Sequence, residues 1–191
     1  LMRREPPSNS GGKEQLVLGA SSFDGLAPLP LVPQEVERIA VLGPSERYLD
    51  RAFTPDVLIN RAGDPAMRRV HVATHAEFLP GGPSRSRIFA GSGSMDLSRF
   101  ASLRQRRSGD PLDLFVLSAC RTALGDSDSE LGFAGLALQA GSRSAIGTLW
   151  YVDDVATSAF FVQFYRYLQQ GLPKAQALSL IHISEPTRRT P

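Results

Sequence analysis

Cys120 and His75 are the two residues whose chemistry could support nucleophilic catalysis. Cys120 is the only cysteine of the 191-residue chain and ends an apolar segment that begins at Leu114. A thiol attacks as its thiolate, and a neighbouring imidazole produces that thiolate by accepting the proton. His75 ends a similar segment about 45 residues earlier. Taken singly, the simpler interpretations are an inert buried thiol and a structural loop histidine; taken together, the two residues favour a Cys–His dyad.

Such a dyad needs elements that bring the two segments together. Apolar segments of strand length alternate with helical patterns, which is typical of an α/β fold with a parallel sheet and helices on both faces. Ligand sites in such sheets form beyond the carboxyl ends of the strands, where His75, Cys120 and the corner at residues 151–154 are expected. The expected strands are Gln15–Gly19, Arg69–His75, Asp113–Cys120 and Ser144–Val152, and the expected helices are Gln34–Leu42, Pro55–Arg61, Leu131–Ala140, Asp153–Gln170 and Pro173–Leu180.

A second histidine and a Gly-, Pro- and Ser-rich segment are further candidates for a functional role. His71 shares a strand face with His75, because side chains alternate along a strand. His75 is preferred as the catalytic residue because it lies at the strand end, whereas His71 is predicted to be a core or supporting residue. The segment 79–94, which includes Gly91–Ser94, is predicted to be an active-site loop. It is not a phosphate-binding loop, because no strand leads into it and no Gly-Lys-Ser/Thr follows.

Composition excludes several classes of protein. The chain has 42% hydrophobic and 21% charged residues, as globular domains do. One cysteine excludes an intrachain disulfide framework and a cysteine-rich zinc site. The 21 basic and 19 acidic residues are dispersed; the densest basic cluster, Arg104 with Arg106 and Arg107, is predicted to be a solvated loop rather than a nucleic-acid surface. No membrane span or signal peptide is evident, so we expect a cytoplasmic protein.

The ends of the chain differ from its middle. Residues 1–14 are rich in polar residues, Gly and Pro and are predicted to be a linker. Residues 15–180 are predicted to form one domain. From residue 181 the helical periodicity stops and a Pro/Arg-rich stretch follows, so residues 181–191 are expected to be a non-native or truncated tail.

Three segments carry a resemblance to a known family: Val70–Phe78, Leu117–Gly125 and Gly147–Asp154. Cys120 stands in an Ala-Cys-Arg sequence, and the histidine precedes it at nearly the offset of about 50 residues found in caspases. The sequence resembles the CHAT domain, a caspase-like, separase-related module of clan CD cysteine peptidases that is often fused to TPR repeats. The resemblance covers about residues 16–180 and implies a three-layer α/β/α sandwich with a mostly parallel central sheet.

The resemblance also implies roles for individual residues. His75 would be the general base and Cys120 the nucleophile that forms an acyl-enzyme with a protein or peptide substrate. The oxyanion would be bound by the backbone N–H groups of Cys120 and Ala76. Asp154, with Asp153, would line the S1 pocket and select a basic P1 residue; alternatively, these carboxylates cap the start of a helix, and one residue could do both.

The expected function is therefore that of a cysteine endopeptidase that uses no metal or cofactor. TPR-type repeats are expected as partners in a longer protein, and neither nucleic acid nor membrane is expected to be contacted. The alternative is a catalytically silent CHAT module that acts as a regulated protein-interaction domain.

Overall fold

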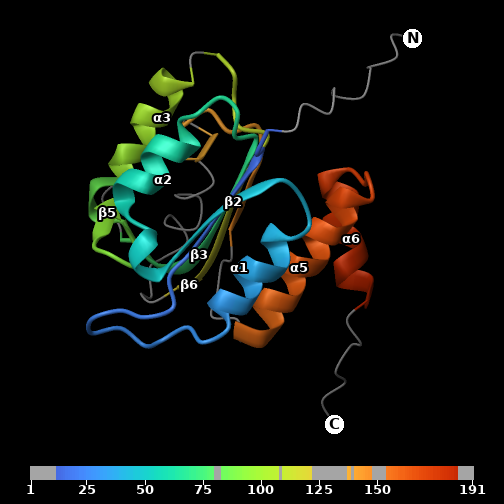
Figure 1. The fold of residues 1–191 in the computed structure, drawn as a ribbon, viewed down its shortest axis with the longest axis horizontal. Coiled ribbons are helices and arrows are strands. Elements are labelled where there is room, and N and C mark those ends of the chain that lie inside the picture. Colours follow the sequence, from blue (N-terminus) through green and yellow to red (C-terminus); the bar gives the residue numbers. More distant parts are fainter. Residues whose placement is uncertain are drawn as a thin grey trace.

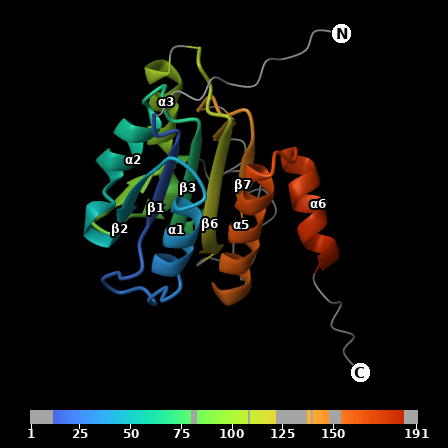
Figure 2. The same cartoon turned by 45° about the vertical axis from the view of Figure 1, so that its right-hand side comes forward.

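A central sheet, to which the described residues contribute seven strands, lies between two layers of helices (Figures 1 and 2). The computed structural model describes residues 12–79, 83–107, 109–121, 137–138, 140–147 and 154–184, and for residues 120, 121, 154 and 182–184 it describes the backbone. The strands are β1 (Gln15–Gly19), β2 (Ser45–Leu49), β3 (Arg69–Glu77), β4 (Arg87–Phe89), β5 (Ser94–Asp96), β6 (Leu114–Arg121) and β7 (Ala145–Gly147).

Five strands run parallel in the order β2–β1–β3–β6–β7. β1 pairs with β3 only as far as Gly19, which lies opposite Ala73. Beyond that point the same edge of β3 pairs antiparallel with β4, through Ala76 and Ile88, and β5 continues the hairpin. The hairpin therefore extends the sheet past the end of β1, and the chain that leaves β1 must turn away from the sheet there.

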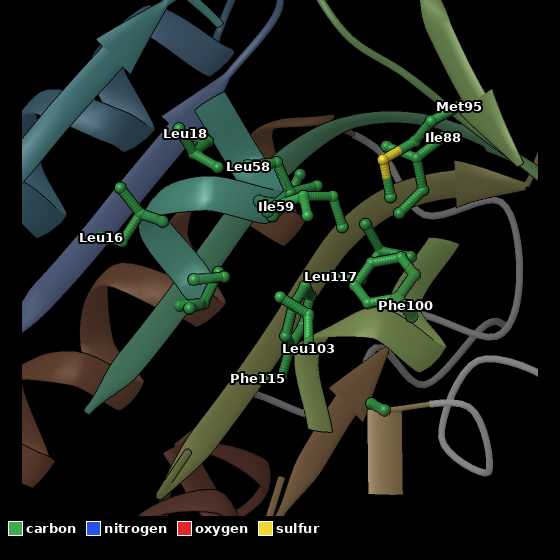
Figure 3. Close-up of a cluster of buried hydrophobic side chains, with 14 of the residues drawn as sticks. Leu16, Leu18, Leu58, Ile59, Ile88, Met95, Phe100, Leu103, Phe115 and Leu117 are labelled. Atoms are coloured by element: carbon green, nitrogen blue, oxygen red, sulfur yellow. The ribbon is translucent and has the colours of Figure 1, made fainter. Parts of the chain in front are cut away.

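Each face of the sheet is covered by its own helices. Helices α1 (Val32–Ala40), α5 (Asp154–Gln169) and α6 (Lys174–Ser184) lie on one face, and α2 (Pro55–Ala62) and α3 (Ala101–Arg106) lie on the other (Figure 1). Alternate residues of β1 serve the two layers: Leu16 and Leu18 pack beneath α2 (Figure 3), whereas Val17 packs beneath α1 and α5. The expected fold class, an α/β/α sandwich with a mostly parallel sheet, is confirmed.

Helix α2 begins where its sequence predicts. Thr54 has extended backbone angles and its hydroxyl accepts a hydrogen bond from the Val57 N–H at 3.1 Å, while Pro55 occupies the first turn. A hydroxyl cap and a proline at the first position both favour a helix start. Three single-turn 3₁₀ helices complete the described elements: η1 (Asp50–Ala52), η2 (Pro83–Arg85) and η3 (Leu97–Phe100).

Several boundaries differ from expectation. β2 was not expected, and the predicted loop 79–94 contains β4 and the start of β5. Both hairpin strands have three residues, too few to show an alternating pattern. Helix α6 runs to Ser184 rather than ending at Leu180, because Ile181 is buried in the core beside α5. Most of the expected helix 131–140 and the end of the strand 144–152 lie outside the described residues.

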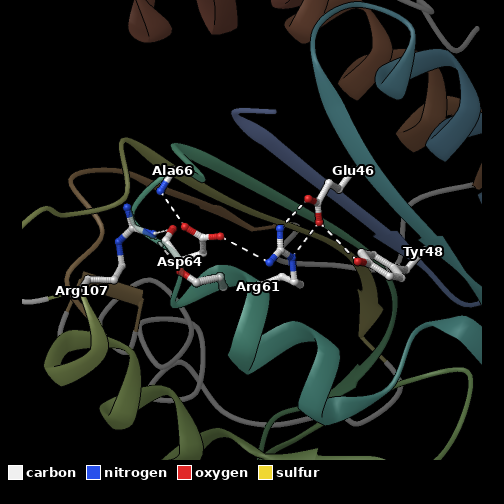
Figure 4. A network of polar contacts seen from close by, with 7 residues as sticks. Glu46, Tyr48, Arg61, Asp64, Ala66 and Arg107 are labelled. Carbon is white, nitrogen blue, oxygen red and sulfur yellow. Dashed lines mark hydrogen bonds and ion pairs between the residues drawn. The ribbon is translucent and has the colours of Figure 1, made fainter. Parts of the chain in front are cut away.

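The prediction of a solvated basic loop is wrong for Arg107. Residues 101–106 form α3, and the Arg107 side chain is 3% exposed. Its guanidinium donates four hydrogen bonds of 2.8–2.9 Å, all to backbone carbonyl oxygens, those of Ala62, Asp64, Met67 and Asp110. Figure 4 shows it beside Asp64, at one end of a polar network that continues through Arg61 to Glu46.

Candidate active site

Neighbouring strands bring His75 and Cys120 to paired positions. β3 and β6 run parallel over eight paired positions, and in this register His75 lies directly opposite Cys120 near the carboxyl ends of both strands. Paired positions on adjacent strands are about 4.8 Å apart and belong to the same face of the sheet. Two residues 45 positions apart in sequence thus become immediate backbone neighbours.

The environment of His75 selects one tautomer of its ring. The side chain is 4% exposed, and its Nε2 lies 2.7 Å from the backbone carbonyl oxygen of Ala27. A carbonyl oxygen can only accept a hydrogen bond, so Nε2 carries the proton. In the neutral ring, Nδ1 is then left with a free lone pair and can act as a base. That atom is buried and has no hydrogen-bond partner among the described side chains.

The loop after β1 holds this ring in place. The ring of Phe23 contacts that of His75 with centroids 4.7 Å apart. Asp50 anchors the start of the loop, because its Oδ1 accepts hydrogen bonds from the Ser21 N–H at 2.7 Å and the Ser21 hydroxyl at 2.8 Å. Asp50 has a positive φ of 48°, a conformation that Asp tolerates better than most residues.

His71 is a core residue, as predicted. It is fully buried, and its Nε2 lies 2.9 Å from a carboxylate oxygen of Glu35, which is itself 1% exposed. The rings of Phe161 and Tyr165 meet its ring edge-on. Tyr165 is buried as well, and the loss of solvent around its hydroxyl raises its pKa. His71 thus joins β3 to α1 and α5 beneath the site, two residues along the same strand face from Ala73 and four from His75.

Of the other three predicted site residues, the structure describes two, Ala76 and Asp154. Ala76 is buried and pairs on one side with Ile88 and on the other with Arg121. Asp154 is the first residue of α5. Asp153 lies outside the described residues. Within the described ranges there is no group of three or more His, Cys, Asp or Glu side chains that could hold a metal ion, and no helix is long and apolar enough to cross a bilayer.

A pocket of about 1010 Å³ is lined in part by Phe23, whose ring contacts His75. It is lined by parts of three segments: residues 22–26 after β1, residues 49–51 after β2, and residues 89–94 of the hairpin. The sequence pattern does not indicate this pocket or the residues around His75. Ala27 contributes only its backbone carbonyl, which leaves no mark in the sequence, and Phe23 is one aromatic residue in a loop.

The family model described as the CHAT domain matches residues 1–185. The match includes both strands that carry His75 and Cys120. No curated protein matches the chain.

Proposed function

Since the chain belongs to the CHAT domain family, which is related to caspase-like cysteine peptidases, we propose that it is a cysteine endopeptidase with Cys120 as nucleophile and His75 as base. The observation that carries the proposal is the register of β3 and β6, which pairs these two positions. The Ala27 carbonyl, which holds the Nε2–H tautomer of His75, supports it further. A histidine whose distal nitrogen is held in this way presents the other nitrogen as the proton acceptor.

In the proposed reaction, Nδ1 of His75 takes the proton of the Cys120 thiol, and the sulfur attacks the carbonyl carbon of the scissile peptide bond. The C–N bond then breaks as the leaving nitrogen takes the proton from Nδ1, which leaves a thioester. Water gives a proton to Nδ1 and attacks the thioester; the acid product leaves and the proton returns to sulfur. The hydrogen bond to Ala27 also stabilises the imidazolium formed twice in this cycle.

Two parts of the proposal come from the family resemblance. The backbone N–H groups of Ala76 and Cys120 would bind the oxyanion, where preorganised donors have their largest effect. Asp154 and Asp153 would bind a basic P1 side chain, since a carboxylate matches a guanidinium bidentately. At the start of α5 the same charge also suits the helix dipole.

The reactivity of the single thiol tests the dyad without a known substrate. We would measure iodoacetamide alkylation of Cys120 against pH. A thiol with the ordinary pKa of about 8.5 is only about 1% thiolate at pH 6.5, so a dyad should react at least tenfold faster there. His75→Gln removes the base but keeps an amide that can donate to Ala27, and it should restore the ordinary profile.

His71→Gln is the matched control, because it removes an imidazole from the same strand face at a position paired with Val116 rather than with Cys120. Its profile should match that of the wild type. An alkylation rate at pH 6.5 that does not respond to His75→Gln would refute the dyad and would favour the interaction-module alternative.

The P1 preference has a separate test. Asp154→Asn should lower kcat/KM for substrates with P1 Arg by about 10- to 100-fold relative to P1 Ala, the value of a charge-assisted hydrogen-bonded pair. Asp56→Asn is the matched control, since Asp56 is an exposed carboxylate in the first turn of α2. An unchanged Arg-to-Ala ratio in Asp154→Asn would remove Asp154 from the S1 pocket.

A further inference from the structure

The pocket lined by the three loop segments lies on the His75 side of the dyad, toward β1 and β2. Strand order places Cys120 on β6, His75 on β3 and then β1, and the pocket is lined by the segments that follow β1 and β2. Phe23 connects the two regions, because its ring contacts His75 and also lines the pocket. A line from Cys120 through His75 therefore leads toward the pocket and away from β7 and the start of α5.

The chemistry of peptide cleavage assigns a direction to the substrate along this line. The nucleophile attacks the carbonyl of P1, and the histidine must protonate the nitrogen of P1′. The chain after the scissile bond therefore passes on the histidine side. We propose, building on the peptidase function above, that this pocket binds the leaving-group side of the substrate and selects an aromatic or aliphatic side chain at P1′ or P2′.

The lining supports an apolar occupant. Four aromatic or aliphatic side chains in the lining are half-buried, namely those of Phe23, Leu26, Leu49 and Phe89, whereas the charged side chains of Asp24 and Arg51 are exposed. The remaining charged group, Asp50, already accepts two hydrogen bonds from Ser21. These four side chains favour burial of an apolar side chain from the peptide, and the polar groups that make up an equal share of the lining can contact the peptide backbone.

The pocket is also preformed. The hydroxyl of Thr74, one residue before His75, donates to the carbonyl of Phe89 and fixes the hairpin to β3. The hairpin loop is closed by a 2.8 Å hydrogen bond from Ala90 N–H to the Gly93 carbonyl. A Cβ on Gly91 would overlap the backbone of Asp50, so only glycine permits this close approach of hairpin and η1. Rigid walls lower the entropic cost of binding.

The test compares substrates with and without residues after the scissile bond. A series of aminocoumarin peptides first identifies the acyl group that is cleaved fastest. That acyl group is then joined to leaving peptides that carry Phe, Leu, Gly or Asp at P1′ and P2′. Burial of a Phe or Leu side chain should raise kcat/KM by about tenfold or more over Gly at one of these positions.

Ser92→Trp places a bulky ring in the pocket from an exposed position, so it should fold and should reduce the Phe-to-Gly ratio of kcat/KM to near one. Ser84→Trp is the matched control, because Ser84 is an exposed serine in η2, just before the hairpin, and does not line the pocket. It should keep the ratio of the wild type.

The outcomes separate the two proposals. Cleavage of the coumarin peptides with equal ratios for Phe, Gly and Asp would overturn the pocket assignment and leave the peptidase function standing. Equal loss of the ratio in Ser92→Trp and Ser84→Trp would also overturn the pocket assignment. Absence of Cys120-dependent cleavage of every coumarin peptide would overturn the peptidase function, and the leaving-group pocket with it.

Discussion

Replacing Arg107 with methionine should destabilise the fold far more than any replacement of its exposed neighbours. Methionine keeps most of the apolar volume but removes four hydrogen bonds to backbone carbonyls at the end of α2, in the turn before β3 and after α3. A hydrogen bond from a charged donor stabilises a protein more than one between neutral groups does. Part of this stabilisation offsets the cost of desolvating the guanidinium, and the same desolvation lowers the pKa of Arg107.

A net value of about 1 kcal/mol per bond gives a loss of about 4 kcal/mol in the free energy of unfolding. For a domain of this size that corresponds to a fall in Tm of about 8–16 °C. Arg107→Lys should recover less than half of the loss. An ammonium group donates from a single point and cannot reach four carbonyls that surround a planar fork.

Urea unfolding followed by far-UV circular dichroism measures the change through the midpoint and slope. Arg106→Met is the matched control, because Arg106 is exposed and donates one hydrogen bond to Asn60 on the surface. It should change stability by less than about 0.5 kcal/mol. A loss below about 1.5 kcal/mol for Arg107→Met, or an equal loss for both variants, would refute the assignment of Arg107 as the connector of α2, α3 and β3.

Three further changes test the layers around the site. Glu35→Leu should lower the free energy of unfolding by about 1–3 kcal/mol, because His71 loses its buried partner, and Glu35→Gln should lose less; equal losses in urea unfolding would contradict this. Gly91→Ala should cost about 1–3 kcal/mol through overlap with the η1 backbone, and an unchanged Tm would contradict it. The hydrogen bond from Arg61 lowers the pKa of Glu46 below its ordinary 4.5. The stability that Glu46 contributes should therefore be constant above that pH and fade below it, so wild type and Glu46→Gln should converge in acid unfolding; a gap that grows with acidity would contradict the pairing.

The layers of the fold could be predicted from local pattern, and the exceptions have physical causes. β1 was predicted to its exact ends because the apolar run at residues 16–18 marks a buried strand, and all five residues of Gln15–Gly19 are buried. β2 escaped notice because Ser45–Leu49 is an edge strand with partly exposed, largely polar residues. The β4–β5 hairpin pairs through backbone groups over three residues, and backbone pairing leaves no pattern in so short a segment.

For the candidate site, the sequence by itself determined the residue types and their places at strand ends. His75 and Cys120 could be selected because a strand-ending His or Cys after an apolar run is visible locally, and their catalytic roles stay predictions. Only the tertiary structure decided that the two positions are paired, that Arg107 is buried, and that the loop after β1 supplies Ala27 and Phe23. These three features depend on strand register, on loop closure and on backbone carbonyl groups. Every residue has a carbonyl group, so no residue type in the sequence indicates them.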